Sequence, residues 1–175
     1  ILIETIFDTL NAKAAAMAAR DAAEAAGREV PIMISMTITD MAGRNLSGHT
    51  VEAFWHAVRH IKPLTIGLNC SFGADLLRPH LAALARQADT LIMAYPNAGL
   101  PNDLGQYDEL PEHTAELIKV WLKDGLINIV GGCCGTTPAH IAAIARAVAG
   151  AEPRSIPTPP VQTRLAGLEP FTMAA

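Results

Sequence analysis

Five short apolar segments alternate regularly with five longer helical patterns, and this order limits the fold more than any other feature of the sequence. The segments that we predict as strands are residues 1–5, 31–37, 65–70, 90–95 and 126–130. The patterns that we predict as helices are residues 9–26, 50–61, 74–88, 111–124 and 138–149. Strands that are apolar along nearly their whole length are typical of a parallel sheet covered by helices. The sequence therefore predicts an α/β fold.

Two parallel architectures fit this order: a doubly wound sheet and part of a (β/α)8 TIM-type barrel. No Gly-x-Gly-x-x-Gly follows the first strand, which weakens a dinucleotide-binding interpretation. The chain begins at Ile1, inside an expected strand and without a methionine, so we expect an amino-terminal part to be missing. A closed barrel would need about three more units there. We expect such an open barrel to leave some interior side chains uncovered: Ile3, Ile34, Met36, Ile66 and Ile92.

Charge and hydropathy exclude two classes of partner. The net charge is −4 and no basic block is present, which argues against nucleic-acid binding. No apolar run approaches the roughly 20 residues that a membrane-spanning helix needs, and no signal peptide is visible. Free thiols suit a reducing compartment, so we expect a cytoplasmic protein.

All three cysteines of the chain follow predicted strands. Cys70 ends the run Gly67-Leu68-Asn69-Cys70, and Cys133 and Cys134 stand side by side in Gly-Gly-Cys-Cys-Gly-Thr-Thr-Pro, residues 131–138. Because the carboxyl ends of parallel strands meet at one edge of a sheet, the three thiols can converge there. Three thiolates around a tetrahedral ion leave one position open, which is the arrangement of a catalytic zinc site. The adjacent glycines let the backbone leave strand geometry, so that both neighbouring cysteines can face one ion.

Two other interpretations of the cysteines remain open at this point. They can be buried core residues, since free cysteine is among the most buried residue types. A disulfide is less favoured because the odd number leaves one thiol over. A bridge between Cys133 and Cys134 would be strained, since adjacent Cα atoms lie only about 3.8 Å apart.

Further polar residues follow the predicted strands and suggest a shared pocket. They are Glu4, Asp8, Thr37, Thr39, Asp40, Asn69 and Asn97. Two of them have simpler alternatives, because Asp8 can cap the next helix and Asn97 can form a turn beside Gly99. None of the six histidines follows a strand, so we expect them on helices or in loops rather than around a metal.

Several segments together resemble the homocysteine-binding domain of cobalamin-dependent methionine synthase. They are residues 4–13 (ETIFDTLNAK), 67–70 (GLNC), 96–102 (PNAGLPN) and 131–138 (GGCCGTTP). The resemblance runs from residue 1 to about 153 and implies a (β/α)8 barrel, of which residues 1–150 would be the last five units. Residues 151–160 form a proline-rich linker, and residues 164–170 resemble the junction into the folate-binding domain. Residues 151–175 would then be the linker and the start of that domain.

The resemblance also implies a function and a set of site residues. Cys70, Cys133 and Cys134 would bind Zn²⁺, Glu4 would hold the ammonium group of homocysteine, and Asn97 would contact its amino-acid moiety. The thiolate of homocysteine would take a methyl group from methylcobalamin and give methionine. Methylcobalamin would be bound by the cobalamin-binding domain of the full-length chain, next to the folate-binding domain.

Three alternatives to this function stay open. The first is a cobalamin-independent homocysteine S-methyltransferase that uses a small methyl donor, although the tail after residue 150 argues against it. The second is an inactive remnant that binds metal weakly or not at all. We expect the piece by itself to be inactive as an enzyme. The third, a thiol redox protein, lacks the Cys-x-x-Cys spacing.

Overall fold

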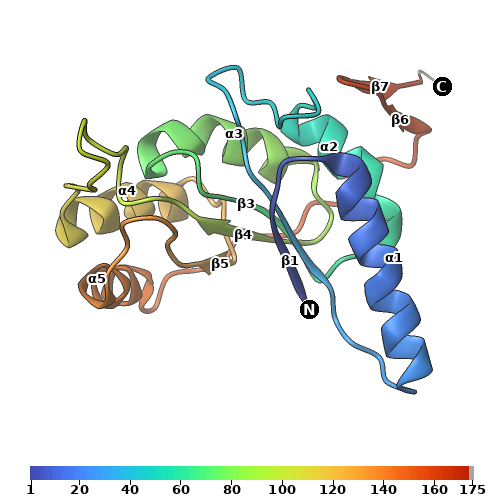
Figure 1. The fold of residues 1–175 in the computed structure, drawn as a ribbon, viewed down its shortest axis with the longest axis horizontal. Coiled ribbons are helices and arrows are strands. Elements are labelled where there is room, and N and C mark those ends of the chain that lie inside the picture. The colour runs from blue at the N-terminus through green and yellow to red at the C-terminus, as the bar shows by residue number, and fades with distance from the viewer. Residues whose placement is uncertain (174–175) are drawn as a thin grey trace.

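The computed structural model describes residues 1–173, in which strands and helices alternate as the sequence predicts (Figure 1). The strands of the main sheet are β1 (Leu2–Ile6), β2 (Met33–Met36), β3 (Thr65–Asn69), β4 (Leu91–Tyr95) and β5 (Ile129–Val130). The helices are α1 (Thr9–Ala25), α2 (Val51–Val58), the 3-10 turn η1 (Arg59–Ile61), α3 (Ala74–Gln87), α4 (Pro111–Lys123) and α5 (Pro138–Val148). None of the helices within residues 1–173 is long and apolar enough to cross a membrane.

The five strands form one parallel sheet in the order β1-β2-β3-β4-β5, so each strand lies beside its neighbour in the sequence. A doubly wound sheet reverses its strand order at a switch point, and this sheet does not. Winding in one direction is what a segment of a TIM-type barrel requires. The α/β prediction is therefore confirmed, and the sheet is consistent with part of such a barrel.

One expectation about the sheet is wrong. Four of the side chains that we expected to be uncovered are fully buried, at 0% exposure: Ile34, Met36, Ile66 and Ile92. They belong to the same core cluster as Trp55 of α2 and Leu77 of α3, and Ile3 packs against that cluster. These residues therefore point to the helix-covered side of the sheet, where helices replace the cover that we had assigned to missing strands.

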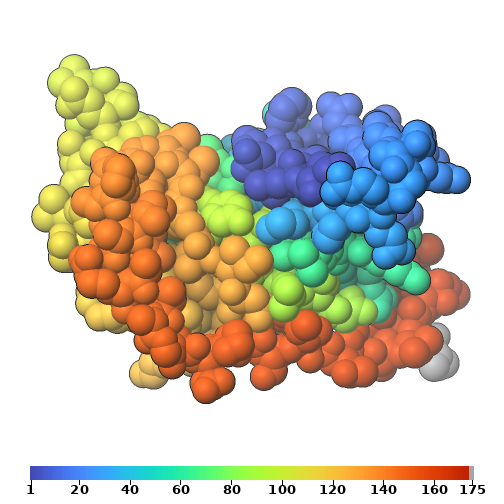
Figure 2. All heavy atoms as spheres, turned by 90° about the horizontal axis from the view of Figure 1, so that it is seen from below, coloured from blue at the N-terminus to red at the C-terminus, as the bar shows by residue number. Residues whose placement is uncertain are grey.

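The other face of the sheet carries Ser35, Gly67 and Met93, which are aligned with one another in the strand register. Asn69 and Tyr95 are aligned in the same way nearer the carboxyl ends of the strands. Viewed from below, green and yellow-green atoms from the middle of the chain are visible between the blue amino-terminal segment and the orange segment around α5 (Figure 2). This row of residues leads toward the carboxyl edge of the sheet, where the cysteines lie.

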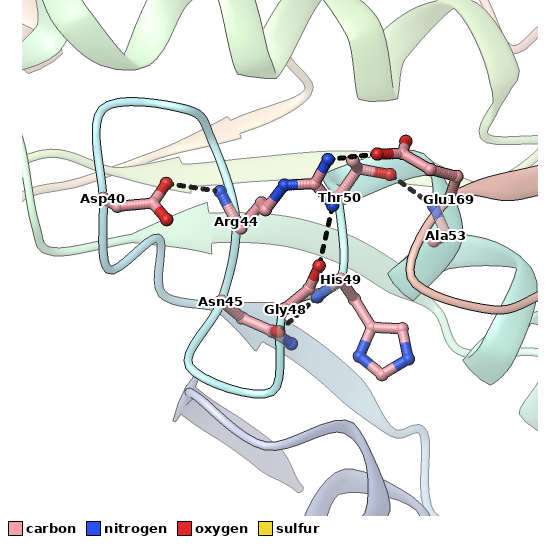
Figure 3. Close-up of polar contacts among 8 residues, drawn as sticks. All are labelled: Asp40, Arg44, Asn45, Gly48, His49, Thr50, Ala53 and Glu169. Atoms are coloured by element: carbon pink, nitrogen blue, oxygen red, sulfur yellow. Dashed lines mark hydrogen bonds and ion pairs between the residues drawn. The ribbon is translucent and has the colours of Figure 1, made fainter.

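The segment after α5 contains a feature that the sequence did not predict. Beyond an irregular stretch, β6 (Arg164–Ala166) and β7 (Pro170–Thr172) form an antiparallel hairpin that packs against α2 (Figure 1). The loop that precedes α2 holds the turn of this hairpin, since Arg44 pairs with Glu169 (Figure 3). In addition, the Thr50 amide donates to the Leu168 carbonyl at 3.1 Å. The segment at residues 164–170, which resembles the junction into a next domain, is thus folded onto the sheet-and-helix body.

Candidate metal centre

The three cysteines come together at the carboxyl edge of the sheet. The Cys70 and Cys134 sulfurs are 3.6 Å apart, and those of Cys133 and Cys134 are 4.0 Å apart. All three sulfurs lie within 4.8 Å of one another, and all three residues are free cysteines. Zn–S bonds of about 2.3 Å in a tetrahedron require sulfur–sulfur separations of about 3.8 Å. The arrangement therefore fits a single tetrahedral ion without rebuilding the backbone.

The backbone at the end of β3 is unusual where it carries the first cysteine. Cys70 and Ser71 have positive φ angles of 64° and 68°, although neither is glycine. The Phe72 amide donates to the Cys70 carbonyl at 2.8 Å, which closes a γ-turn around Ser71. Such conformations cost about 1–3 kcal/mol each and concentrate at functional sites. The turn takes Cys70 out of the regular strand and brings its sulfur to Cys134.

The glycine-rich turn after β5 places the two adjacent cysteines together. A Cβ on Gly132 would lie 2.3 Å from the Thr136 hydroxyl, so only glycine fits at that position. The Cys133 amide donates to the Pro96 carbonyl at 2.8 Å, and the Thr136 amide donates to the Cys133 carbonyl at 3.1 Å. The turn is therefore held by a hydrogen bond to the loop after β4 and by a hydrogen bond within the turn. Its conformation brings the sulfurs of Cys133 and Cys134 within 4.0 Å of each other.

The electrostatics of the cluster favour a bound cation. Burial, followed by the nearby Cys70 and Cys134 thiolates, raises the pKa of Cys133 to about 11. Without a cation, Cys133 keeps its proton at neutral pH, because two or three adjacent thiolates would repel one another. A coordinating metal removes the proton from a thiol outright. The three cysteines are therefore unfavourable together as free thiolates, whereas they are favourable as the ligands of a metal cation.

Asn97 lies at the cluster, but its visible role is structural. Its side chain is 3% exposed, and its Oδ1 accepts a hydrogen bond from the Cys134 amide at 3.1 Å. The backbone amide of Asn97 donates to the Phe72 carbonyl at 2.9 Å. Asn97 thus joins the loop after β4 to the turns that carry Cys70 and Cys134, and its contact with an amino acid stays a prediction.

Glu4 is the middle residue of β1 and is exposed. Burial, and after it the negative charge of Glu4, raises the pKa of Tyr95 at the end of β4. Ile3 and Ala94 pack in the core on the helix-covered side, so by strand alternation their neighbours Glu4 and Tyr95 point to the other face of the sheet. The role of Glu4 with an ammonium group stays a prediction.

The other residues after the strands divide into two groups. Thr37 reaches toward the cysteine turn, since its hydroxyl lies 2.9 Å from that of Ser71. Asp40 instead accepts from the Arg44 amide within the loop before α2 (Figure 3), and the Thr39 hydroxyl donates to the Arg44 carbonyl, so these two residues do not line a shared pocket. Asp8 accepts from the Asn11 amide at 2.8 Å and caps α1, which was its simpler alternative. The predicted shared pocket is thus only partly formed.

Tyr107 is a site residue that the sequence argument missed. It comes from the long loop between β4 and α4, and a Cβ on Gly135 would lie 2.3 Å from its Cβ and Cγ atoms. Burial, followed by a hydrogen bond with Cys134, raises the pKa of Tyr107. The available signal was a single aromatic residue in a loop otherwise rich in Gly, Pro, Asn and Asp. Tyr107 packs over the glycine-rich turn and covers one side of the cluster.

Two further polar features of the described chain are not part of the cysteine cluster. His140 is buried and bonds to Thr137 and to the Glu109 carbonyl, which is a structural role. A cavity of about 880 Å³ lies between α1, η1 and the amino end of β2, with Arg20, Glu24 and Lys62 in its wall. Among residues 1–173, the cysteine cluster is the one group of three or more potential metal ligands within coordination distance.

Comparison with known proteins identifies the family of the chain. The family model described as homocysteine S-methyltransferase matches residues 1–148. The chain belongs to this family. Three crystal structures of the homocysteine methyltransferase MmuM from Escherichia coli match the fold: the apo form (TM-score 0.62, 21% identity), the oxidized form (0.64, 21%) and the metallated form (0.63, 22%). Each match covers 83% of this chain and between 43% and 48% of the other, so the chain spans less than half the length of these structures.

Proposed function

We propose that this chain is the homocysteine-binding part of a zinc-dependent methyltransferase that converts homocysteine to methionine. The observation that carries the proposal is the three-sulfur cluster, whose 3.6 and 4.0 Å separations suit a tetrahedral ion with one open position. Membership of the homocysteine S-methyltransferase family supports the substrate. The thiol of homocysteine is the fourth sulfur that such a site would accept.

Different residues of the chain would bind the metal and the amino-acid end of homocysteine. Cys70, Cys133 and Cys134 would hold the Zn²⁺, which supplies the positive charge that keeps a bound homocysteine sulfur as a nucleophilic thiolate at neutral pH. Asn97 fixes the backbone of Cys134 through its 3.1 Å hydrogen bond. Glu4 would accept hydrogen bonds from the substrate ammonium group. The homocysteine thiol gives its proton to solvent on binding, and its sulfur then forms the new bond to the methyl carbon as the donor leaves.

We further propose that the donor is methylcobalamin, held by another domain of a longer protein. The motifs at residues 67–70 and 131–138 and the tail at residues 164–170 support this finer assignment. In that arrangement, residues 1–150 are the last five units of a (β/α)8 barrel, and residues 151–175 lead into a folate-binding domain. A cobalamin-independent homocysteine methyltransferase is the second candidate, because the matched structures carry only the name homocysteine methyltransferase.

The test of the metal site is the zinc content of the purified chain and of its Cys134→Ala variant. We expect about one equivalent of zinc in the parent chain and none in the variant, because the two remaining cysteines bind zinc far more weakly than three do. A matched control is His113→Ala, which removes an exposed potential ligand that is not part of the cluster and should keep the zinc. Full zinc retention by Cys134→Ala would show that the cluster is not the metal site.

A further inference from the structure

Asn69, the last residue of β3, makes four hydrogen bonds with one side-chain amide, and it is 2% exposed. Its Oδ1 accepts from the Thr5 amide at 3.0 Å and from the Ser35 hydroxyl at 2.6 Å. Its Nδ2 donates to the Thr5 hydroxyl at 2.9 Å and lies 4.0 Å from the Cys133 sulfur. One buried group therefore links β1, β2 and β3 to a metal-binding cysteine.

The orientation of this amide is fixed by its partners. The Thr5 backbone N–H can only donate, so the atom that faces it must be the carbonyl oxygen of Asn69. The NH₂ group is consequently directed to the Thr5 hydroxyl and to Cys133. All four hydrogen-bonding positions of the amide are used, and a buried polar network that is fully satisfied holds one geometry. The Asn69 N–H is thus aimed at the Cys133 sulfur by atoms outside the cluster.

The same amide supports an irregularity in β1. The register passes from Ile3 opposite Ile34 to Ile6 opposite Met36, so β1 contains one extra residue. Thr5 lies in this bulge with a positive φ of 55°. Its amide leaves the strand ladder and bonds to Asn69 instead. Bulges redirect neighbouring side chains, and the neighbour of Thr5 here is Glu4.

We propose that Asn69 is a positioning residue that sets the orientation of the Cys133 sulfur and the direction of Glu4 together. This inference rests on the proposed function, in which the sulfur holds the metal and Glu4 holds the substrate ammonium group. Loss of the amide should therefore weaken metal binding and homocysteine binding in one step, although Asn69 touches neither ligand. Partners of this kind, one shell away from the metal, change metal affinity by about 10- to 100-fold.

The test uses the Asn69→Leu variant, which keeps the size and branching of the side chain but removes all four hydrogen bonds. Cobalt(II) replaces zinc as the probe, because its thiolate charge-transfer and ligand-field bands report the environment of the sulfurs. We expect a shift of these bands, a 10- to 100-fold lower metal affinity, and weaker homocysteine binding by calorimetry on the metal-loaded chain. The matched control is Asn128→Leu, which removes a similar strand-bridging amide at the other end of the sheet. It should leave the cobalt spectrum unchanged.

A second variant covers the case in which Asn69→Leu does not fold. Ser35→Ala removes only the hydroxyl that donates to Asn69 Oδ1, and within residues 1–173 the Ser35 side chain makes no hydrogen bond to the cluster or to β1. Losing this one hydrogen bond should weaken metal binding about two- to tenfold in the same direction. An unchanged spectrum and unchanged affinities in whichever variant folds would overturn the proposal, as would an equal effect of Asn128→Leu. A parent chain that binds neither metal nor homocysteine would instead refute the proposed function.

Discussion

Two asparagines bridge strands of the same sheet, one at each end, and their partners differ in kind. At the amino end, Asn128 accepts from the Ile92 amide at 2.9 Å and donates to the Arg154 carbonyl at 2.8 Å, so both of its partners are backbone groups. At the carboxyl end, one partner of Asn69 is the Cys133 sulfur of the cluster. In parallel α/β folds, the amino end of the strands serves stability and the carboxyl end carries the chemistry. The two side chains show how similar residues serve these different purposes.

Backbone strain follows the same division. Three of the four non-glycine residues with positive φ within the described chain, Thr5, Cys70 and Ser71, lie at the carboxyl ends of β1 and β3. The fourth, Lys62, ends η1. Each such residue costs about 1–3 kcal/mol, so the cluster is built at the expense of stability. Stability must come from elsewhere, and the amino end of the sheet supplies part of it.

Arg154 is the strongest anchor at the amino end. It is 5% exposed, and its guanidinium donates to the carbonyls of Ala85, Ala88 and Thr90 at distances from 2.6 to 2.9 Å. Its own amide donates to the Ile127 carbonyl at 3.0 Å. One side chain thus closes the end of α3 and fastens the segment after α5 to β4.

The largest effect that separates the two ends should come from Arg154→Met. The variant leaves up to three buried carbonyls without a donor, and each costs about 1–3 kcal/mol unless water reaches it. We expect chemical denaturation to show a free energy of unfolding lower by about 2–4 kcal/mol, with unchanged metal stoichiometry. Arg86→Met, at an exposed position on α3, is the control and should change stability by less than about 0.5 kcal/mol. Loss of metal in Arg154→Met would mean that metal binding at the carboxyl end of the sheet depends on the packing at the amino end.

Glu4→Gln should have the opposite effect to Arg154→Met, because it should weaken substrate binding and leave the free energy of unfolding unchanged. Removing the carboxylate charge should weaken homocysteine binding about ten- to hundredfold, as expected for a lost charge-assisted hydrogen bond of about 1.5–3 kcal/mol. Calorimetry on the zinc-loaded chain measures the affinity, and zinc content and stability should not change. Glu152→Gln, an exposed site after α5, is the control. Unchanged homocysteine affinity would remove Glu4 from the binding site.

The sequence predicted the helices, the strands and the meeting of the cysteines for one physical reason. Apolar runs and helical patterns alternate clearly, and the ends of parallel strands converge wherever such alternation holds. Because the strands are apolar along nearly their whole length, the sequence did not show which face of the sheet packs on helices. Ile34 and Ser35 are both fully buried, although they point to opposite faces. A strand covered on both sides has no polar face to distinguish them.

Other features could not be predicted because they depend on contacts between distant segments. The strands of the β6–β7 hairpin have only three residues each, and the hairpin packs on α2, far away in the sequence. Tyr107 reaches Cys134 only because its long loop folds back over the glycine-rich turn. The amide of Asn69 was visible as a strand-end residue, but its partner Thr5 required the bulge in β1.

The hairpin allows a pH test of the comparison at His56, which lines a cavity together with Arg164 and Thr90, near the amino end of β4. Burial, then the charges of Arg164 on β6 and Arg59 on η1, lowers the pKa of His56, while Glu52 on α2 opposes them. The fold therefore favours neutral His56, and this stabilisation is present above the ordinary pKa near 6.5 and is lost as pH falls below it. Between pH 7.5 and 5.5, the thermal midpoint of the metal-free chain should fall less in His56→Leu than in the parent. An equal fall in both would exclude His56, and His113→Leu serves as the exposed control.

The smallest effect should come from Glu169→Gln, which breaks the ion pair with Arg44 that Figure 3 shows on the hairpin. The two side chains are 32% and 60% exposed, and such surface pairs contribute about 0–1 kcal/mol. Denaturation should detect a loss of less than about 1 kcal/mol, which disappears at high salt because the pair is screened. The hydrogen bond from Thr50 to the Leu168 carbonyl and the packing on α2 remain in the variant. A loss above about 2 kcal/mol would mean that charge, rather than packing, holds the tail, and the contrast with the buried Arg154 anchor would fail.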